Sequence, residues 1–438
     1  MSKQLKLNTG VQITIADTPF ASGAEGDLFD VMAPIAFLHA VVKVYKAAKQ
    51  TPERQQKITY LVNHPPAGLV QQGVHNSVCW MTHIVYEQDQ FVGFVMPKVA
   101  GVSLELLCQS RLKHPVLNDP VWQRFALTAP EGLQLRLKLC FNIAVALQHI
   151  HAQGCYTLVD MKPDNIIVQA NGLVSIIDID SIAVIDTAKN NNYPAIVITP
   201  EYAPPEYYRS IDLTHINHSW DNFSVAIIFY RLLCGIHPFM GTCHPPYDNH
   251  SETAQFIQDG LLPHGNSAQY FSVIPPPHNR FNQLDKGLQK LFLHCFDQGH
   301  LYPIFRPNVE NWCVVLQKIM LNMSSPSIQI AKSYVSFNGY TNTAWTAPVQ
   351  PIAHANKNVL KIIYSLTMLF MCFILVLAII SAIITINKNS VTQIIVAKPQ
   401  IPYVALTHIT QPAPVVTKKA INENEIHNCL VSGNCTNP

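Results

Sequence analysis

Residues 159–168 read Val-Asp-Met-Lys-Pro-Asp-Asn-Ile-Ile-Val, the most informative stretch of the chain. It follows a helical pattern that ends at His151. A second apolar run leads into residues 176–180, Ile-Ile-Asp-Ile-Asp, where Asp178 comes thirteen residues after Asn165. Asp and Asn side chains on loops beside apolar strands suit Mg²⁺, which prefers oxygen ligands. An Asp two residues before a Lys can orient a hydroxyl while the Lys balances charge on phosphate oxygens, so the stretch indicates phosphoryl chemistry.

The composition favours a protein with a large folded core. Of the 438 residues, 48% are hydrophobic and only 13% are Asp, Glu, Lys or Arg, against about 25% charged residues in an average soluble protein. The formal net charge is +2, so no strongly basic surface points to nucleic acid, and no nucleic-acid partner is expected. The 11 cysteines include no Cys-x-x-Cys pair, which argues against a zinc ribbon or a small disulfide scaffold.

The first 320 residues predict a small β-rich part followed by a larger helical part. Alternating apolar residues flank Asn8-Thr9-Gly10, which is a hairpin signal. Apolar strand-like runs and long helical patterns follow in that order. They are the runs Ala40–Tyr45, Thr82–Tyr86 and Phe91–Met96 and the helical patterns Leu135–His151 and Phe223–Leu233. This order of elements predicts an α+β fold.

Two segments of the β-rich part carry residues suited to a nucleotide. Residues 21–28 read Ala-Ser-Gly-Ala-Glu-Gly-Asp-Leu, and Gly23 and Gly26 would let backbone N–H groups approach phosphate closely. Taken alone, the two glycines could equally form a turn. Lys43 lies inside the apolar run Ala40–Tyr45 and needs a polar partner, because an unpaired buried ammonium is costly. An edge strand with Lys43 facing water is the alternative.

Taken together, these segments resemble the eukaryotic-like (Hanks-type) serine/threonine protein kinases, and divergent bacterial members more than typical eukaryotic ones. The spacing from Asp160 to Asn165 matches the family's HRDxxxxN loop, and Asp178 stands where the metal-binding DFG aspartate falls. Residues 199–206, Thr-Pro-Glu-Tyr-Ala-Pro-Pro-Glu, resemble the family's TPEYxAPE segment. The resemblance covers about residues 10–320 and implies a bilobal fold, with a small β-rich N-lobe and a larger helical C-lobe.

Three later positions extend the resemblance. Asp221 resembles the aspartate that anchors the catalytic loop, and Gly235–Phe239 resembles the GxxPF turn that follows. Arg306 matches the late arginine that pairs with the position of Glu206. In matching kinases the hydroxyl at the position of Thr199 contacts the catalytic Asp and Lys, so a structural role is expected for Thr199.

The resemblance also implies a role for each matching residue. Asp160 would accept or orient the substrate hydroxyl proton, and Lys162 would neutralise the γ-phosphoryl group. The implied cofactors are ATP and Mg²⁺, and the implied reaction is phosphorylation of serine or threonine on an unidentified protein. The residues implied to bind ATP are Gly23, Gly26, Lys43, Met96 and Val99, and those implied to hold Mg²⁺ are Asn165 and Asp178.

The sequence departs from the family pattern at four places. Three are replacements: Leu158 and Val159 stand for the His and Arg before the catalytic Asp, Asp180 for the DFG glycine, and Ala21 for the first loop glycine. The missing Arg normally reads a phosphate on the activation loop. The fourth is a missing acid about 19 positions after Lys43, where helix C normally supplies a glutamate. Glu53 is the one glutamate between Lys43 and Glu87.

Two other functions stay open. A small-molecule phosphotransferase on the same fold would also have an Asp-x-Asp metal loop, but Lys162 and residues 199–206 favour a protein kinase. A pseudokinase signalling scaffold is favoured by the missing helix C acid and by the altered residues before Asp160, Leu158 and Val159. The retained Lys43, Asp160, Asn165 and Asp178 oppose it.

The rest of the chain predicts a membrane anchor. Residues 362–386 contain no Asp, Glu, Lys, Arg or His, and at about 1.5 Å per residue they exceed the roughly 30 Å hydrocarbon core. The expected organisation is an N-lobe at 1–98, a C-lobe at 99–321, a juxtamembrane linker at 322–361, a transmembrane helix at 362–386 and an extracytoplasmic tail at 387–438.

The orientation follows from the kinase interpretation, because lysines flank the span equally on both sides. ATP is cytosolic, so the kinase domain is expected in the cytoplasm and the tail outside, at a bacterial inner membrane. Cys429 and Cys435 could form a disulfide there or remain free thiols. Ala378 and Ala382 form a small-xxx-small pair that could support a homodimer.

Overall fold

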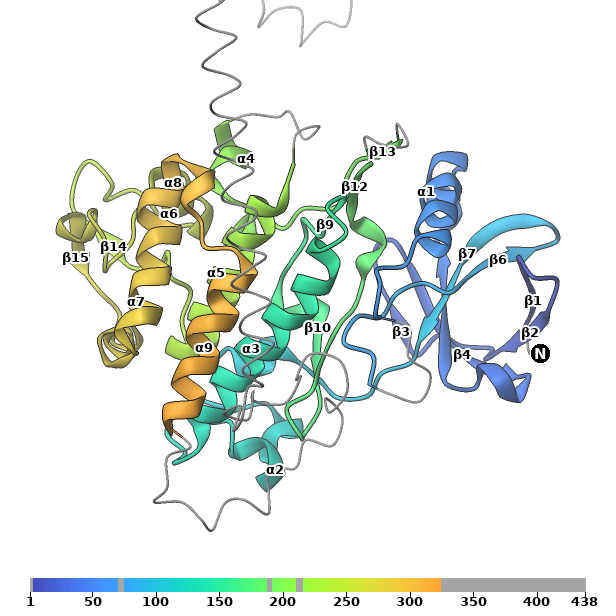
Figure 1. Ribbon diagram of the computed structural model, residues 1–438, viewed down its shortest axis with the longest axis horizontal. Helices are drawn as coiled ribbons and strands as arrows, with labels where there is room; N and C mark the ends of the chain where they lie inside the picture. The colour runs from blue at the N-terminus through green and yellow to red at the C-terminus, as the bar shows by residue number, and fades with distance from the viewer. Residues whose placement is uncertain (1–2, 70–74, 187–190, 210–215, 324–438) are drawn as a thin grey trace, which may run out of the picture. The chain divides into compact units, whose positions relative to one another are not determined.

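Figure 1 shows the computed structural model, with an antiparallel sheet at one side and a group of long helices at the other. The structure describes residues 3–69, 75–186, 191–209 and 216–323. Strands dominate up to Pro97 and helices dominate after it. The expected α+β order of the first 320 residues is therefore confirmed.

The large sheet has the strand order β2-β1-β6-β7-β5-β4-β3. Its strands are β1 (Lys3–Leu7), β2 (Gln12–Ile15), β3 (Ala21–Ser22), β4 (Gly26–Ala33), β5 (Ala40–Tyr45), β6 (His83–Glu87) and β7 (Gln90–Pro97). The predicted hairpin around residues 8–10 is confirmed, because β1 and β2 pair antiparallel with Leu5 opposite Ile13. Gly10 takes a φ of 85° in the turn, a conformation that glycine adopts without strain.

Strand β5 lies inside this sheet, between β4 and β7. Successive side chains of a strand point to opposite faces. Val42 packs into the small apolar cluster on one face. Val41 and Tyr45 pack into the main core on the other face, which is therefore the face of Lys43. The edge-strand alternative for Lys43 is thus wrong, because the Lys43 side chain is buried in the interior.

Helix α1 (Pro52–Asn63) packs against the sheet at β6 and β7. It begins with Thr51, whose side chain accepts a hydrogen bond from the backbone N–H of Arg54 at 3.3 Å. Proline at the first helical position suits a helix start, because its missing N–H would have no partner there. The buried face includes Arg54 and Lys57 beside apolar residues, so the apolar periodicity that predicts helices is weak here.

The helical part is built around two long helices, α3 (Gly132–His151) and α5 (His218–Cys234). Figure 1 shows α9 running alongside α3, and the two helices are in extensive contact. Helix α5 is buried over nearly its whole length and ends at Gly235, which has a φ of 79°. The other helices are α2 (Pro120–Gln123), α4 (Pro205–Arg209), α6 (Thr253–Asp259), α7 (Lys286–Leu293), α8 (Gly299–Leu301) and α9 (Val309–Met323).

Short strands in the helical part position the loops that carry polar residues. The three small sheets are β11-β10-β8, β13-β12-β9 and β14-β15. Their strands are β8 (Val102–Ser103), β9 (Tyr156–Thr157), β10 (Ile166–Val168), β11 (Val174–Ile176), β12 (Ala183–Asp186), β13 (Asn191–Tyr193), β14 (Thr242–Cys243) and β15 (Phe271–Val273). The loop before β10 and the loop after β11 lie side by side, because the N–H of Ile177 donates to the carbonyl of Asn165 at 2.8 Å.

The predicted membrane anchor lies outside the described residues, as do Ala378, Ala382, Cys429 and Cys435. Helix α9 extends to Met323, so the first two residues of the predicted linker belong to that helix. In the part of the chain that the structure describes, no helix is long and apolar enough to cross a membrane.

Candidate active site

The loop that leads into Asp160 is held by one buried carboxylate. Asp221, in the first turn of α5, accepts hydrogen bonds from the backbone N–H groups of Leu158 and Val159, both at 2.8 Å. Its Oδ2 also lies 2.9 Å from Nε2 of His151. Val159 has a φ of 67°, a costly conformation for a β-branched residue. The Asp221 contacts hold this turn, so the anchoring role that the resemblance implied for Asp221 agrees with the geometry.

Asp160 lies in a polar cluster with the buried Asn165 and the half-buried Lys162 and Thr199. The Thr199 hydroxyl donates to Oδ1 of Asp160 at 2.6 Å, and Nζ of Lys162 lies 2.9 Å from Oδ2. Lys162 also donates to the Thr199 hydroxyl at 2.9 Å. Nδ2 of Asn165 donates to the backbone carbonyl of Asp160 at 2.9 Å. The expected contact of Thr199 with Asp160 and Lys162 is therefore confirmed.

Lys43 crosses from the sheet to the loop after β11. Its Nζ lies 2.5 Å from Oδ1 of Asp178 and 2.8 Å from Oδ1 of Asp180. The Tyr45 hydroxyl donates to Oδ2 of Asp180 at 2.7 Å. Asp178 has a left-handed backbone with a φ of 58°, which Asp tolerates better than most residues. The structure thus pairs Lys43 with Asp178 and Asp160 with Asn165, and the loops that carry Asp178 and Asn165 are joined by the backbone hydrogen bond from Ile177 to Asn165.

The surroundings shift the pKa values of Asp178 and Asp180 in opposite directions. Burial and the adjacent Asp180 carboxylate raise the pKa of Asp178 above its ordinary value, although Lys43 partly offsets this. Burial alone would also raise the pKa of Asp180, but the Lys43 charge and hydrogen bonds from Lys43 and Tyr45 lower it overall. A divalent cation beside Asp178 would relieve the repulsion between the carboxylates. The residues therefore fit Mg²⁺, with Asp178 and Asn165 available as oxygen ligands.

Glu53 does not supply the missing helix acid. It lies exposed in the first turn of α1, whereas the side chain of Lys43 is only 8% exposed and contacts Asp178 and Asp180. Within α1, the residue on which the Asp180 charge acts is basic: that charge raises the pKa of Lys57, although burial lowers it overall. The lysine of β5 therefore has ion-pair partners, but they come from the loop after β11.

The two predicted glycines differ in what surrounds them. A Cβ on Gly26 would lie 2.5 Å from the carbonyl oxygen of Val44, so close packing of β4 on β5 requires glycine there. A Cβ on Gly23 would lie 3.7 Å from the nearest atom, the carbonyl oxygen of Gly26. Steric demands of the fold therefore explain Gly26 but not Gly23. Glu25, between them, forms ion pairs with Lys49 at 2.8 Å and with Arg54.

Met96 and Val99 lie where the chain passes from the sheet to the helical part. Met96 is buried in β7, where it pairs with Val41 of β5. Strand β7 ends at Pro97, and Val102 of β8 pairs with Val168 of the helical part. Val99, in the segment between β7 and β8, is half-buried against the core. A role of these two residues at a nucleotide base stays a prediction.

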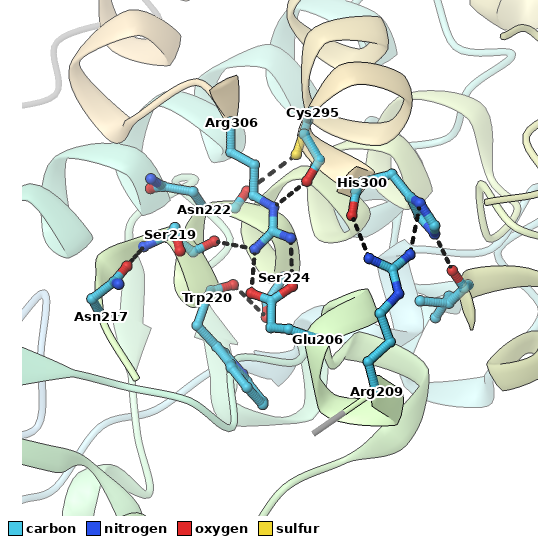
Figure 2. Close-up of polar contacts among 12 residues, drawn as sticks. Glu206, Arg209, Asn217, Ser219, Trp220, Asn222, Ser224, Cys295, His300 and Arg306 are labelled. Atoms are coloured by element: carbon cyan, nitrogen blue, oxygen red, sulfur yellow. Dashed lines mark hydrogen bonds and ion pairs between the residues drawn. The ribbon is translucent and has the colours of Figure 1, made fainter. Parts of the chain in front are cut away.

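A partly buried ion pair fixes the end of the segment that begins at Thr199. The guanidinium of Arg306 makes two hydrogen bonds with the carboxylate of Glu206, at 2.7 and 2.6 Å (Figure 2). Arg306 also donates to the backbone carbonyls of Ser219 at 3.1 Å and Gly299 at 2.8 Å. Nearby, Nη2 of Arg209 lies 3.2 Å from Nδ1 of His300. The predicted pairing of Glu206 with Arg306 is confirmed.

Comparison with known families supports this geometry. The model of the protein kinase domain matches residues 22–298. This chain belongs to the protein kinase domain family. The two-part fold described above is therefore a protein kinase fold, and the paired loops that carry Asp160 and Asp178 lie within the matched range.

Individual kinases are similar to this chain at low identity. The serine/threonine-protein kinase MRCK gamma of Homo sapiens is 26% identical over 188 residues, which are 41% of this chain and 11% of the relative. The serine/threonine-protein kinase GRIK2 of Arabidopsis thaliana is 28% identical over 189 residues, 38% of this chain and 46% of the relative. The chain thus spans less than half the length of these relatives.

A solved structure, that of Rad53 residues 1–466 in complex with AMP-PNP, matches with 16% identity and a TM-score of 0.45. The match covers 69% of this chain and 64% of that one.

Three residues of the kinase site, Tyr45, His151 and Asp180, had no role predicted for them from the sequence. Asp180 accepts a hydrogen bond from Lys43, and Tyr45 donates one to Asp180. His151 lies within hydrogen-bond distance of Asp221, which anchors the loop before Asp160. Asp180 had a signal in the sequence, because an acid in the apolar stretch 176–183 needs a buried partner. That partner is Lys43, for which the sequence left both a buried polar partner and a water-facing edge strand open. Tyr45 and His151 carried no such signal, since both residue types are common in cores.

Proposed function

We propose that this chain is an active protein kinase that transfers the γ-phosphoryl group of ATP to serine or threonine hydroxyls of proteins. The observation that carries the proposal is the cluster of Asp160, Lys162 and Thr199. Each oxygen of the Asp160 carboxylate has its own partner, Thr199 at 2.6 Å and Lys162 at 2.9 Å. A carboxylate fixed in this way can orient a hydroxyl for in-line transfer.

The remaining residues supply charge and position. Lys43 would hold the α/β-phosphates, and Lys162 would offset charge that develops on the transferred phosphoryl group. Gly23, Gly26, Met96 and Val99 would bind the rest of the nucleotide, in the positions that the resemblance implied. Mg²⁺, when held by Asp178 and Asn165, would neutralise phosphate oxygens. Phosphoryl transfer depends mainly on positioning and electrostatic stabilisation, so each of these residues is expected to affect the rate.

Several observations favour a protein kinase over the two alternatives. Lys162, two residues after Asp160, binds the Thr199 hydroxyl, and Thr199 opens the segment that small-molecule phosphotransferases of this fold lack. The curated relatives described above are named serine/threonine-protein kinases. One argument for a pseudokinase was the missing helix C acid, which would leave Lys43 without its usual ion pair; the other was the altered flank of Asp160. The first argument loses its force, because Lys43 pairs with Asp178 and Asp180.

We further propose that the kinase is a single-pass protein of a bacterial inner membrane. The support is the uncharged run of residues 362–386 and the divergent motifs. The catalytic domain would be cytoplasmic and the tail outside, and the span could pair in a homodimer. Extraction of cell membranes with alkaline carbonate should leave the full chain in the pellet and release a variant that lacks residues 362–386. Release of both proteins would contradict the anchor.

Phosphotransferase activity is the direct test of the proposed function. The full chain, purified in detergent, is incubated with radiolabelled ATP, Mg²⁺ and a basic protein substrate, beside Asp160→Asn and Asp178→Asn variants. Label on serine and threonine that is lost in both variants is the expected result. Label on tyrosine would contradict the serine/threonine assignment. Nucleotide binding without transfer to protein would favour the small-molecule phosphotransferase or the pseudokinase.

A further inference from the structure

The inner face of helix α1 carries basic residues where a kinase of the usual pattern presents an acid. Arg54 is 7% exposed and Lys57 is 3% exposed. The guanidinium of Arg54 binds Glu25 of the loop between β3 and β4, and Nζ of Lys57 donates to the carbonyl of Pro194 at 3.1 Å. Helix α1 therefore offers cations to its surroundings, and the partner of Lys43 must come from another element.

The two aspartates that contact Lys43 have different surroundings. The side chain of Asp178 is 45% exposed, whereas that of Asp180 is 6% exposed. The oxygens of Asp180 have separate protein donors, Lys43 at Oδ1 and the Tyr45 hydroxyl at Oδ2. Because the Asp180 side chain is almost fully buried and held by both donors, it is less open to a metal ion than the Asp178 side chain. Asp178 can face a ligand while it still contacts Lys43.

We propose that Asp180 is a positioning residue that replaces the helix-borne glutamate as the anchor of Lys43. This inference rests on the proposed function for its consequence in catalysis, but not for the ion pair itself. Asp178 is thereby left for the metal. The ammonium of Lys43 is fixed between β5 and the loop after β11, so its position depends on that loop and not on an acid from α1.

Tyr45 and Arg54 extend the anchor to the glycine-containing loop. Tyr45 follows Lys43 by two residues, so both side chains lie on the same face of β5. The Arg54 guanidinium lies 4.5 Å from the centre of the Tyr45 ring, within the range of a cation–π contact. Because Arg54 also binds Glu25, a chain of contacts runs from that loop through α1 and Tyr45 to Asp180. Helix α1 thus supports the anchor through an aromatic ring.

Nucleotide binding with and without metal distinguishes an anchor from a metal ligand. The full chain and its Asp180→Asn, Asp178→Asn and Tyr45→Phe variants are titrated with a fluorescent ATP analogue, first in EDTA and then over a range of Mg²⁺ concentrations. Asp180→Asn should weaken binding in EDTA by about tenfold, because a misplaced Lys43 loses a charge-assisted hydrogen bond to phosphate. Its half-saturating Mg²⁺ concentration should stay within about twofold of the wild-type value.

The comparison variants make the readout specific. Asp178→Asn should raise the half-saturating Mg²⁺ concentration, while Tyr45→Phe should weaken binding in EDTA in the same direction as Asp180→Asn but less. The exposed Asp248 gives a matched control, since Asp248→Asn should match the wild-type protein in both titrations. If Asp180→Asn instead raises the Mg²⁺ requirement and leaves binding in EDTA unchanged, Asp180 is a metal ligand and the proposal is overturned.

A second measurement tests the ion pair without nucleotide, so it holds even if the proposed kinase activity fails. Urea unfolding midpoints are compared for Lys43→Met, Asp180→Asn and the double variant. Removing one partner leaves the other buried charge uncompensated. The double variant should therefore lose less stability than the two single variants lose together. Additive losses would overturn the proposal. Should Asp180→Asn fail to fold, Tyr45→Phe decides, and wild-type nucleotide binding by that variant would count against the anchor.

Discussion

Glu206 and Arg306 form a two-pronged ion pair that joins α4 to the segment before α9, across 100 residues of sequence. The Arg306 side chain is fully buried, while that of Glu206 is about one-third exposed. Arg306 also donates to two backbone carbonyls, so its guanidinium fixes three segments of the helical part at once (Figure 2).

Replacing Arg306 by Met should destabilise the protein by about 3 kcal/mol, at the lower end of the cost of breaking a buried ion pair, because Glu206 retains access to water. Glu206→Gln keeps the size and half of the hydrogen bonding, so its cost should be about 1–2 kcal/mol. Urea denaturation of both variants measures these differences. A loss below about 1 kcal/mol for Arg306→Met would show that the pair contributes little.

The two glycines before β4 and at its start should respond differently to alanine. Gly26→Ala places a Cβ 2.5 Å from the Val44 carbonyl oxygen and should cost about 1–3 kcal/mol through overpacking. Gly23→Ala meets nothing closer than 3.7 Å and should change stability by less than about 0.5 kcal/mol. If the Gly23 backbone approaches phosphate, Gly23→Ala should still raise the KM for ATP. Urea denaturation and steady-state kinetics separate the two effects, and equal stability of the two variants would contradict the steric argument.

Local patterns in the sequence predicted part of this fold because their physical causes are local. The strand Ala40–Tyr45 has the bounds that its apolar run indicated, and the fixed spacing from Asp160 to Asn165 marks a loop whose residues contact one another. Helix α1 was not predicted from periodicity, because Arg54 and Lys57 occupy its buried face. Their polar partners, Glu25 and the Pro194 carbonyl, lie far away in the sequence.

The choice of partner for Lys43 depended on the tertiary structure. The sequence indicated that Lys43 needs a polar partner or an edge position, and Glu53 was the one acid considered for it, because no local rule links Lys43 to Asp178 or Asp180, which lie 135 and 137 residues away. The three-dimensional arrangement decides among these three acids, because β5 and the loop after β11 face each other while Glu53 points to solvent. A missing motif residue in a sequence therefore need not mean a missing interaction in the fold.

Because Val159 replaces the arginine that would bind a phosphate, we expect activity not to require phosphorylation of the activation segment. At the position of the phosphate-reading arginine, Val159 is 2% exposed and packs with Ala183, Ala203 and Trp220. The apolar cluster holds this region without an added charge. Treatment of the purified protein with phosphatase should leave kcat within about twofold of the untreated value, a change too small to indicate a lost charge-assisted contact.

Val159→Arg is the complementary variant, because it places an uncompensated charge in that apolar cluster and should destabilise the protein. A large loss of activity after phosphatase treatment would mean that a phosphate is read by another cation. Mass spectrometry before and after the treatment establishes that any phosphate was removed.

Lys57 should give the protein a stability that rises with pH in the alkaline range. Burial lowers the pKa of Lys57 from 10.5 to about 8, with the Arg54 charge acting in the same direction and the Asp180 charge opposing it. Between about pH 8 and 10.5 the unfolded chain therefore binds more protons at this site than the folded chain, so the free energy of unfolding increases with pH. Below about pH 8 Lys57 is protonated in both the folded and the unfolded chain, so its contribution to the free energy of unfolding no longer changes with pH.

The measurement is the difference in unfolding free energy between the wild-type protein and Lys57→Met at several pH values. Burial also lowers the pKa of Lys138 to about 8, so the wild-type profile alone would mix two lysines, whereas the difference isolates Lys57. The wild-type protein should gain on the variant by at most about 1.4 kcal/mol per pH unit between pH 8 and 10.5, since one proton is involved. Lys138→Met should retain this gain relative to the Lys57→Met/Lys138→Met double variant. If the free energies of unfolding of the wild-type protein and Lys57→Met change with pH in the same way, Lys57 keeps an ordinary pKa and the prediction is wrong.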